Sequence, residues 1–179
     1  SIYRQEILSK HYSDFKCISP DIDETPHIDE KAISLAERLS STKANKIAKE
    51  FPDHFVIGSD QVASFEERIL GKPGSYDNAL SNFKLFKGKS LHFFAGVSIR
   101  NESLSINRNV LETTEIRFKN YTDEDMINYL DSLDTFNTTA GVKSESVLFS
   151  PLVDQIISND KYAIIGRPMN WIVDQLSEF

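Results

Sequence analysis

The chain has 179 residues, a formal net charge of -7 and one cysteine. This length is typical of one domain, and we predict a single domain over residues 1–179. A lone cysteine cannot form an internal disulfide, which excludes the small disulfide-bonded secreted proteins and favours a cytoplasmic location. The acidic charge balance argues against general nucleic-acid binding, and no run reaches the ~20 apolar residues of a membrane-spanning helix. We therefore expect neither nucleic acid nor a membrane as a partner.

The first half of the chain predicts helices alternating with strands. A helical pattern begins at once, without an initial Met, so we expect a few residues to precede Ser1. A short strand is predicted over 14–18, with Cys17 as a small buried residue. An acidic loop follows. The next predicted elements are a long amphipathic helix over 30–51, a buried strand over 55–58, and a strand or hairpin over 62–70.

The second half predicts capped helices and a pair of long strands. Ser75 is placed to cap a helix that runs to about residue 87, and Gly88 is placed to end it. Thr122 and Asp125 resemble a capping box, and the helix after them would bury four apolar side chains, those of Met126, Ile127, Tyr129 and Leu130. Further predicted elements are strands over 91–99, 104–118 and 162–165, and a last helix from Pro168. Because the 91–118 pair reads as antiparallel, a mixed sheet is favoured over a purely parallel one.

Asp60 and Lys72 are the first candidate functional residues. Asp60 follows the predicted strand 55–58, and strand ends are where ligand crevices form in α/β sheets. Its carboxylate could bind a metal or accept a proton from water, although a single Asp after a strand also commonly caps a turn. Lys72 lies in the turn Gly71-Lys72-Pro73, where an ammonium suits a phosphate group, but the spacing is not that of a P-loop. Together they favour phosphate chemistry.

The acidic loop and the histidines do not indicate a metal site. Five acidic residues lie between positions 21 and 30, but no glycine stands at the sharp turn of a calcium loop, so a solvated loop is the simpler interpretation. The four histidines are scattered without the spacing of zinc ligands. A Ser-His-Asp or Cys-His arrangement cannot be assembled from the sequence.

Six short motifs follow one another along nearly the whole chain: Ser1-Ile2-Tyr3-Arg4, Asp23-Glu24-Thr25-Pro26, Lys43-Ala44, Gly58-Ser59-Asp60-Gln61-Val62, Gly71-Lys72-Pro73 and Ala140-Gly141-Val142-Lys143-Ser144-Glu145. In this order they resemble the Maf family of nucleoside triphosphate pyrophosphatases. The resemblance is greatest to its YceF-like branch, which acts on 7-methyl-GTP, and it lacks only the family's opening strand. Ile2, Gln5 and Ser146 depart from the residues that are usual there.

The resemblance implies both a fold and a reaction. The implied fold is α/β and ITPase-like, an elongated mixed sheet flanked by helices, with two lobes around a deep cleft. The implied reaction hydrolyses the α–β phosphoanhydride bond of a nucleoside triphosphate, releases pyrophosphate, and uses a divalent metal cation, Mg²⁺ or Mn²⁺. The family also implies a homodimer.

The resemblance assigns roles to residues of the predicted cleft. Asp60 falls on the family's proton acceptor, and we expect it to orient or deprotonate the attacking water. Glu24 falls on an acidic position, and with Asp60 it could hold the metal. Arg4, Lys43 and Lys72 fall on basic positions: Arg4 could grip phosphate with two parallel hydrogen bonds, and the lysines would act as point charges.

Tyr3, Gln61 and Glu145 match the positions that differ between branches of the family, and we expect them to set substrate specificity. N7-methylation makes guanine a cation, which an aromatic ring and a carboxylate suit better than a guanidinium does. A ring over such a cation is worth roughly 0.5–2 kcal/mol. The alternative for Tyr3 is simple packing at the start of a helix.

Two other functions stay open at this point. One is a house-cleaning pyrophosphatase of broader specificity, acting on dTTP, UTP or other modified nucleotides. The other is a non-catalytic nucleotide-binding regulator of cell division. Asp60 argues against the regulator, because a pure binder gains nothing from a carboxylate beside anionic phosphates.

Overall fold

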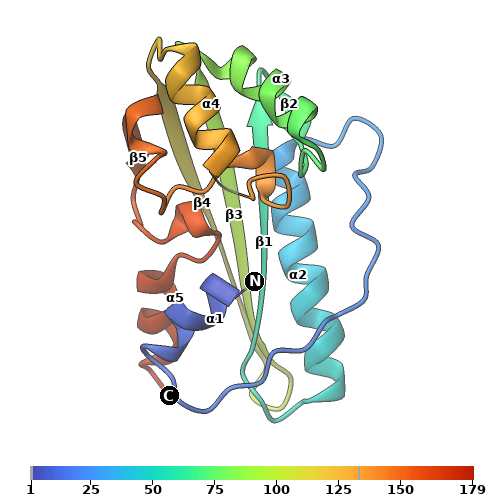
Figure 1. Cartoon of the computed structure of the whole chain (residues 1–179). Coiled ribbons are helices and arrows are strands. Elements are labelled where there is room, and N and C mark those ends of the chain that lie inside the picture. Colours follow the sequence, from blue (N-terminus) through green and yellow to red (C-terminus); the bar gives the residue numbers. More distant parts are fainter. Residues whose placement is uncertain (1, 133) are drawn as a thin grey trace.

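A computed structural model describes residues 2–132 and 134–179, apart from the side chains of residues 2–4 and 7. In this part of the chain, five strands form one sheet in the order β2-β1-β3-β4-β5 (Figure 1). The strands are β1 (Val56–Phe65), β2 (Arg68–Leu70), β3 (Ser90–Asn101), β4 (Ile106–Phe118) and β5 (Val153–Ser158). The helices are α1 (Ile2–Ser9), α2 (Ala32–Glu50), α3 (Tyr76–Phe86), α4 (Asp123–Ser132) and α5 (Met169–Leu176). Helices packed on a sheet confirm the predicted α/β class.

Every strand pairing in the described residues is antiparallel, so the prediction of a mixed sheet was wrong. Parallel neighbours need a crossover connection of a dozen or more residues. Here β1 turns directly into β2 at Glu66 and Glu67, whose φ angles of 47° and 64° suit a two-residue hairpin turn. A similarly short turn at 102–105 joins β3 to β4. The antiparallel pattern predicted for 91–118 therefore extends to the whole sheet.

Helix α2 packs against one face of β1 and β3, and two glycines allow its backbone to come close. A Cβ added at Gly58 would lie 2.4 Å from the carbonyl oxygen of Ser40, and one at Gly96 would lie 2.4 Å from that of Ala36. Because side chains alternate along a strand, Asp60 lies on the same face as Gly58.

The opposite face of the sheet carries two apolar clusters. The larger one joins α3 and α4 to β1, β3 and β4, with rings of Phe65, Phe83, Phe118 and Tyr129 among its members. The smaller one joins α1 and α5 to the other end of the same strands through Leu8, Val97, Met169 and Ile172. Figure 1 shows these helix pairs at opposite ends of the sheet. This division matches the two lobes that the family resemblance implies, whereas the deep cleft between them stays a prediction.

The predicted helix caps are confirmed. Ser75 precedes α3, and its hydroxyl accepts a hydrogen bond from the amide of Asn78 at 3.3 Å. Thr122 and Asp125 bond reciprocally at the start of α4: each side chain accepts from the other residue's amide, both at 3.1 Å. Both devices satisfy amide groups that have no partner within the helix.

Several local predictions were wrong. Residues 14–18 form no strand, and Cys17 is exposed. Residues 162–165 lie around a 3-10 helix, Ala163–Ile165, while the outer strand is β5. In α4, Ile127 is exposed, unlike the other three apolar residues predicted to be buried there. The strand predicted over 55–58 and the hairpin predicted as one alternative for 62–70 are confirmed, but the break between them is not, because β1 is continuous over Val56–Phe65. A short apolar run does not show whether a segment forms a strand, a loop or a 3-10 helix, because pairing with other elements decides this.

Candidate functional site

Asp60 lies in the middle of β1 and not beyond a strand end, so that part of the prediction was wrong. Its side chain faces α2 and is largely buried, with 13% of it exposed. Lys43 comes from α2, and its Nζ lies 2.6 Å from Oδ1 of Asp60. The cross-strand neighbour of Asp60 is Gly96, which adds no side chain beside the carboxylate.

Glu24 joins the same ammonium from the loop before α2. Its Oε1 lies 2.7 Å from Nζ of Lys43, so one lysine bridges two carboxylates from separate segments. The side chain of Glu24 is 59% exposed, whereas that of Lys43 is 15% exposed. The structure therefore brings together three of the predicted site residues. Glu24 lies at the surface, and Lys43 and Asp60 are largely buried between α2 and the sheet.

Lys72 and Glu145 lie on two exposed loops that contact each other. The amide of Ala140 donates to the carbonyl oxygen of Gly71 at 2.9 Å, and the amide of Gly74 donates to that of Phe136 at 3.0 Å. The 3-10 helix Thr139–Gly141 also packs against β1. Because β2 runs antiparallel to β1 and Leu70 pairs with Ala63, the chain leaves β2 in the direction of Asp60. In the described part of the chain, however, no hydrogen bond or ion pair links Lys72 or Glu145 to Asp60.

Tyr129 of α4 holds the loop that carries Glu145. Its buried hydroxyl donates to the carbonyl oxygen of Gly141 at 2.9 Å and accepts from the amide of Lys143 at 2.8 Å. Burial raises the pKa of this phenol well above its usual value. The sequence predicts Tyr129 only as a core residue, because a hydroxyl that bonds backbone groups 12 and 14 residues away leaves no local pattern.

Gln61 faces away from Asp60, as alternation along β1 requires. Its Nε2 donates to the carbonyl oxygen of Ile164 at 2.6 Å and more weakly to that of Ala163 at 3.4 Å. These bonds tie β1 to the segment before α5. The side chains of Tyr3 and Arg4 lie outside the described residues, so their predicted roles stay predictions.

Arg38 and Glu30 form an ion pair beside the site that the sequence analysis missed. Nε and Nη2 of Arg38 lie 2.7 Å from the two carboxylate oxygens of Glu30. Arg38 thereby lowers the pKa of Glu30 to about 2. Asp60 is among the charges that raise the pKa of Arg38. Glu30 precedes the helix, so the pair has no helical spacing that could predict it.

The carboxylates fit a metal only together with a ligand. In the described residues, no group of three or more His, Cys, Asp and Glu side chains is arranged to hold a metal ion. Glu24 and Asp60 supply two carboxylates around one ammonium. Mg²⁺ typically takes one or two protein carboxylates and completes its shell with water and phosphate oxygens. This donor set therefore suits a cation shared with a phosphate chain.

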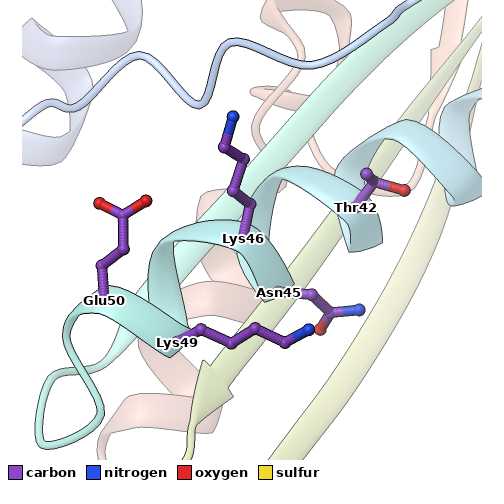
Figure 2. Close-up of a pocket in the computed structure, with 5 residues that line it drawn as sticks. All are labelled: Thr42, Asn45, Lys46, Lys49 and Glu50. Carbon is purple, nitrogen blue, oxygen red and sulfur yellow. The ribbon is translucent and has the colours of Figure 1, made fainter.

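A separate surface hollow lies further along α2. It is lined by Thr42, Asn45, Lys46, Lys49 and Glu50 (Figure 2). These residues are polar, and none of them was predicted as a site residue. Figure 2 shows Lys46 pointing toward the loop that passes over the helix, whereas Lys49 points along the helix surface.

Comparison with known proteins places the chain in a family. Residues 1–179 match the Maf-like protein family, and the chain belongs to it. A 7-methyl-GTP pyrophosphatase of Colwellia psychrerythraea is 35% identical over 99% of this chain and 88% of its own length. Proteins with the same name from Pseudoalteromonas translucida and Bordetella pertussis are 34% and 35% identical, each over 100% of this chain and 88% of their own length. Among the described residues, no helix has both the length and the apolar character to cross a membrane.

Proposed function

We propose that this protein is a nucleoside triphosphate pyrophosphatase that hydrolyses 7-methyl-GTP to 7-methyl-GMP and pyrophosphate. The observation that carries the proposal is the buried Asp60 carboxylate within 2.6 Å of the Lys43 ammonium. It combines an acceptor for a proton with a cation for phosphate at one point of the sheet. Family membership and relatives that bear this name support the same activity.

The reaction needs an activated water and compensation of the charge on a triphosphate. Asp60 would accept a proton from the water, or orient it, as it attacks the α-phosphorus. Lys43 would turn from the carboxylates to a phosphate oxygen, and Lys72 and Arg4 would bind further oxygens of the chain. Phosphoryl transfer depends largely on such positioning and electrostatics.

A divalent cation completes the proposal. Glu24 and Asp60 would hold it, and when bound it would draw negative charge from the phosphate oxygens. Either Mg²⁺ or Mn²⁺ suits these oxygen ligands. Tyr3, Gln61 and Glu145 would set the substrate preference, and of these Tyr3 and Glu145 would favour the cationic methylated base. The hydrogen bonds of Gln61 also hold β1 against the segment before α5.

The proposal also covers the domain organisation, the oligomeric state and the location of the protein. We propose a single domain, supported by one sheet that is continuous from β2 to β5. We further propose a cytoplasmic homodimer. The exposed Ile156 and Ile157 on the outer strand β5 support such a contact, and sedimentation of the purified protein tests it.

The activity is tested with a panel of triphosphates and purified protein. We expect kcat/KM for 7-methyl-GTP to exceed that for GTP, dTTP and UTP by about tenfold or more, with Mg²⁺ or Mn²⁺ present. Products are resolved by chromatography. Equal rates across the panel would instead support the broader house-cleaning activity, and binding without release of pyrophosphate would support a regulator.

Asp60→Asn tests the proposed base. The amide keeps the shape of the side chain but cannot accept the proton, so kcat should fall by roughly 10²–10⁴ while the protein stays folded. Circular dichroism checks the fold. Glu115→Gln is a matched carboxylate-to-amide control on β4, and it should leave kcat unchanged. Full turnover by Asp60→Asn would refute the assignment of the base.

A further inference from the structure

The loop before α2 lies along that helix as a strap, defined here as residues 21–30. It has no helix or strand of its own. Three basic side chains of α2 hold it. Lys46 donates to the carbonyl oxygen of Asp21 at 2.7 Å. Lys43 pairs with the carboxylate of Glu24. Arg38 donates to the carbonyl oxygen of Thr25 and to the carboxylate of Glu30. The strap therefore depends on side chains of α2 for its position.

The attachment at Arg38 is the most extensive of the three. Its guanidinium makes two parallel hydrogen bonds to the carboxylate of Glu30, both at 2.7 Å, and Nη2 also donates to the carbonyl oxygen of Thr25 at 3.0 Å. The same carboxylate accepts from the amide of His27 at 2.9 Å. The Glu30 side chain is 8% exposed, so this charge is held away from most of the solvent. Charge-assisted bonds of this two-fold kind are strong and directional.

One of the bonds of Arg38 holds the backbone next to Glu24. Thr25, whose carbonyl oxygen Arg38 holds, is the next residue, and the strap is bonded again at His27. Glu24 itself is mostly exposed, and its described contact to the rest of the site is the ion pair with Lys43. An exposed ion pair alone fixes a side chain weakly, because its attraction is screened and ordering costs entropy. The backbone around Glu24 must therefore be held by something else.

We infer that Arg38 and Glu30 are positioning residues that hold the strap so that Glu24 stands opposite Asp60. The inference rests on the proposed function, in which Glu24 and Asp60 share a cation and phosphate oxygens. In this arrangement Arg38 and Glu30 would bind neither the nucleotide nor the reacting atoms. They act through Glu24.

A double-mutant cycle in the full chain tests this dependence. The variants are Arg38→Met, Glu24→Gln and the two together, assayed on whichever triphosphate the wild type cleaves best. Arg38→Met should lower kcat/KM by between about tenfold and a hundredfold, as expected for a displaced ligand group. Added to Glu24→Gln, it should cause little further loss, because the residue through which it acts is already disabled. Losses that simply multiply would overturn the inference.

Two further variants separate positioning from general stability. Arg38→Lys keeps the charge but not the two parallel bonds, so it should recover only part of the activity; full recovery would show that the paired bonds are not needed. Arg117→Met is the matched control. Arg117 makes the same two-bond pair with Glu115 on β4, at 2.9 and 3.1 Å, and its loss should leave kcat/KM unchanged.

Hydrogen exchange gives a readout that does not depend on the substrate. Arg38→Met should speed amide exchange in residues 21–30, where the amide of His27 loses an ordered partner, and leave the central strand β1 protected. Unchanged exchange in the strap would overturn the inference. If the wild type cleaves no triphosphate, the proposed function fails, while this measurement still decides whether Arg38 holds the strap.

Discussion

At the scale of single residues, two glycines determine how near α2 lies to the site. At Gly58 and Gly96 an added Cβ would meet helix backbone at 2.4 Å. Contacts this short cannot be relieved by moving a flexible side chain. The helix is therefore close enough for Lys43 to reach Asp60, and the missing Cβ atoms are a structural condition for that ion pair.

Gly96→Ala tests this condition. The new methyl group would press on the backbone of α2, so we expect the free energy of unfolding to fall by about 1–3 kcal/mol. Urea denaturation measures the change. Gly71→Ala is the matched control: among the described residues, no atom beyond its two chain neighbours lies within 4 Å of the added Cβ, and the change should stay within about 0.5 kcal/mol. Equal stability of Gly96→Ala and wild type would contradict the close-approach explanation.

At the scale of elements, α4 both completes a lobe and supports a candidate site loop. Its N-terminus is held by the Thr122–Asp125 capping box. Further along the helix, Tyr129 packs in the larger apolar cluster and its hydroxyl bonds two backbone groups of the 141–143 segment. The position of Glu145 thus depends on the helix that precedes its loop in the chain.

Tyr129→Phe separates the two functions of this side chain. The ring would still pack, but the carbonyl of Gly141 and the amide of Lys143 would lose a partner, at a cost of about 1–3 kcal/mol for each buried group left unbonded. We also expect a smaller preference for 7-methyl-GTP over GTP. Thr122→Ala is a control in the same helix, because losing the cap costs roughly 0.5–2 kcal/mol without touching the loop. An unchanged substrate ratio in Tyr129→Phe would argue against the loop's role.

At the scale of the whole molecule, paired carboxylates make stability depend on pH. Arg38 lowers the pKa of Glu30, and Arg117 and Ser90 lower that of Glu115, in both cases from 4.5 to about 2. A carboxyl group whose pKa is lower in the folded chain binds protons more readily when the chain unfolds. Its stabilising contribution is therefore complete above pH 4.5 and is lost as the pH falls toward 2.

We accordingly expect the melting temperature to decline between about pH 4.5 and pH 2. In the double variant Arg38→Met/Arg117→Met, each carboxyl group loses the arginine that lowers its pKa most, so the decline in this window should be shallower. Thermal unfolding followed by circular dichroism at a series of pH values makes the comparison. A slope equal to that of the wild type would show that other groups control the acid transition.

Elements with local sequence signals could be predicted without the structure. Helices α2, α3 and α4 follow from apolar spacing of 3.6 residues and from caps at Ser75 and Thr122, because a helix forms its bonds within one segment. Through resemblance, the motif that contains Asp60 also pointed to the correct family, while the role of Asp60 itself stays a prediction.

The resemblance placed Lys43 and Glu24 in one predicted cleft with Asp60, but the ion pairs that join these three side chains are seen only in the folded chain. Lys43 is 17 residues away from Asp60 in sequence, and Glu24 is on a loop without periodic structure. The strand β5 likewise forms by pairing with β4 and not from an apolar pattern, since most of its side chains are exposed. Contacts of this kind depend on how whole elements pack, and a pattern of neighbouring residues does not contain them.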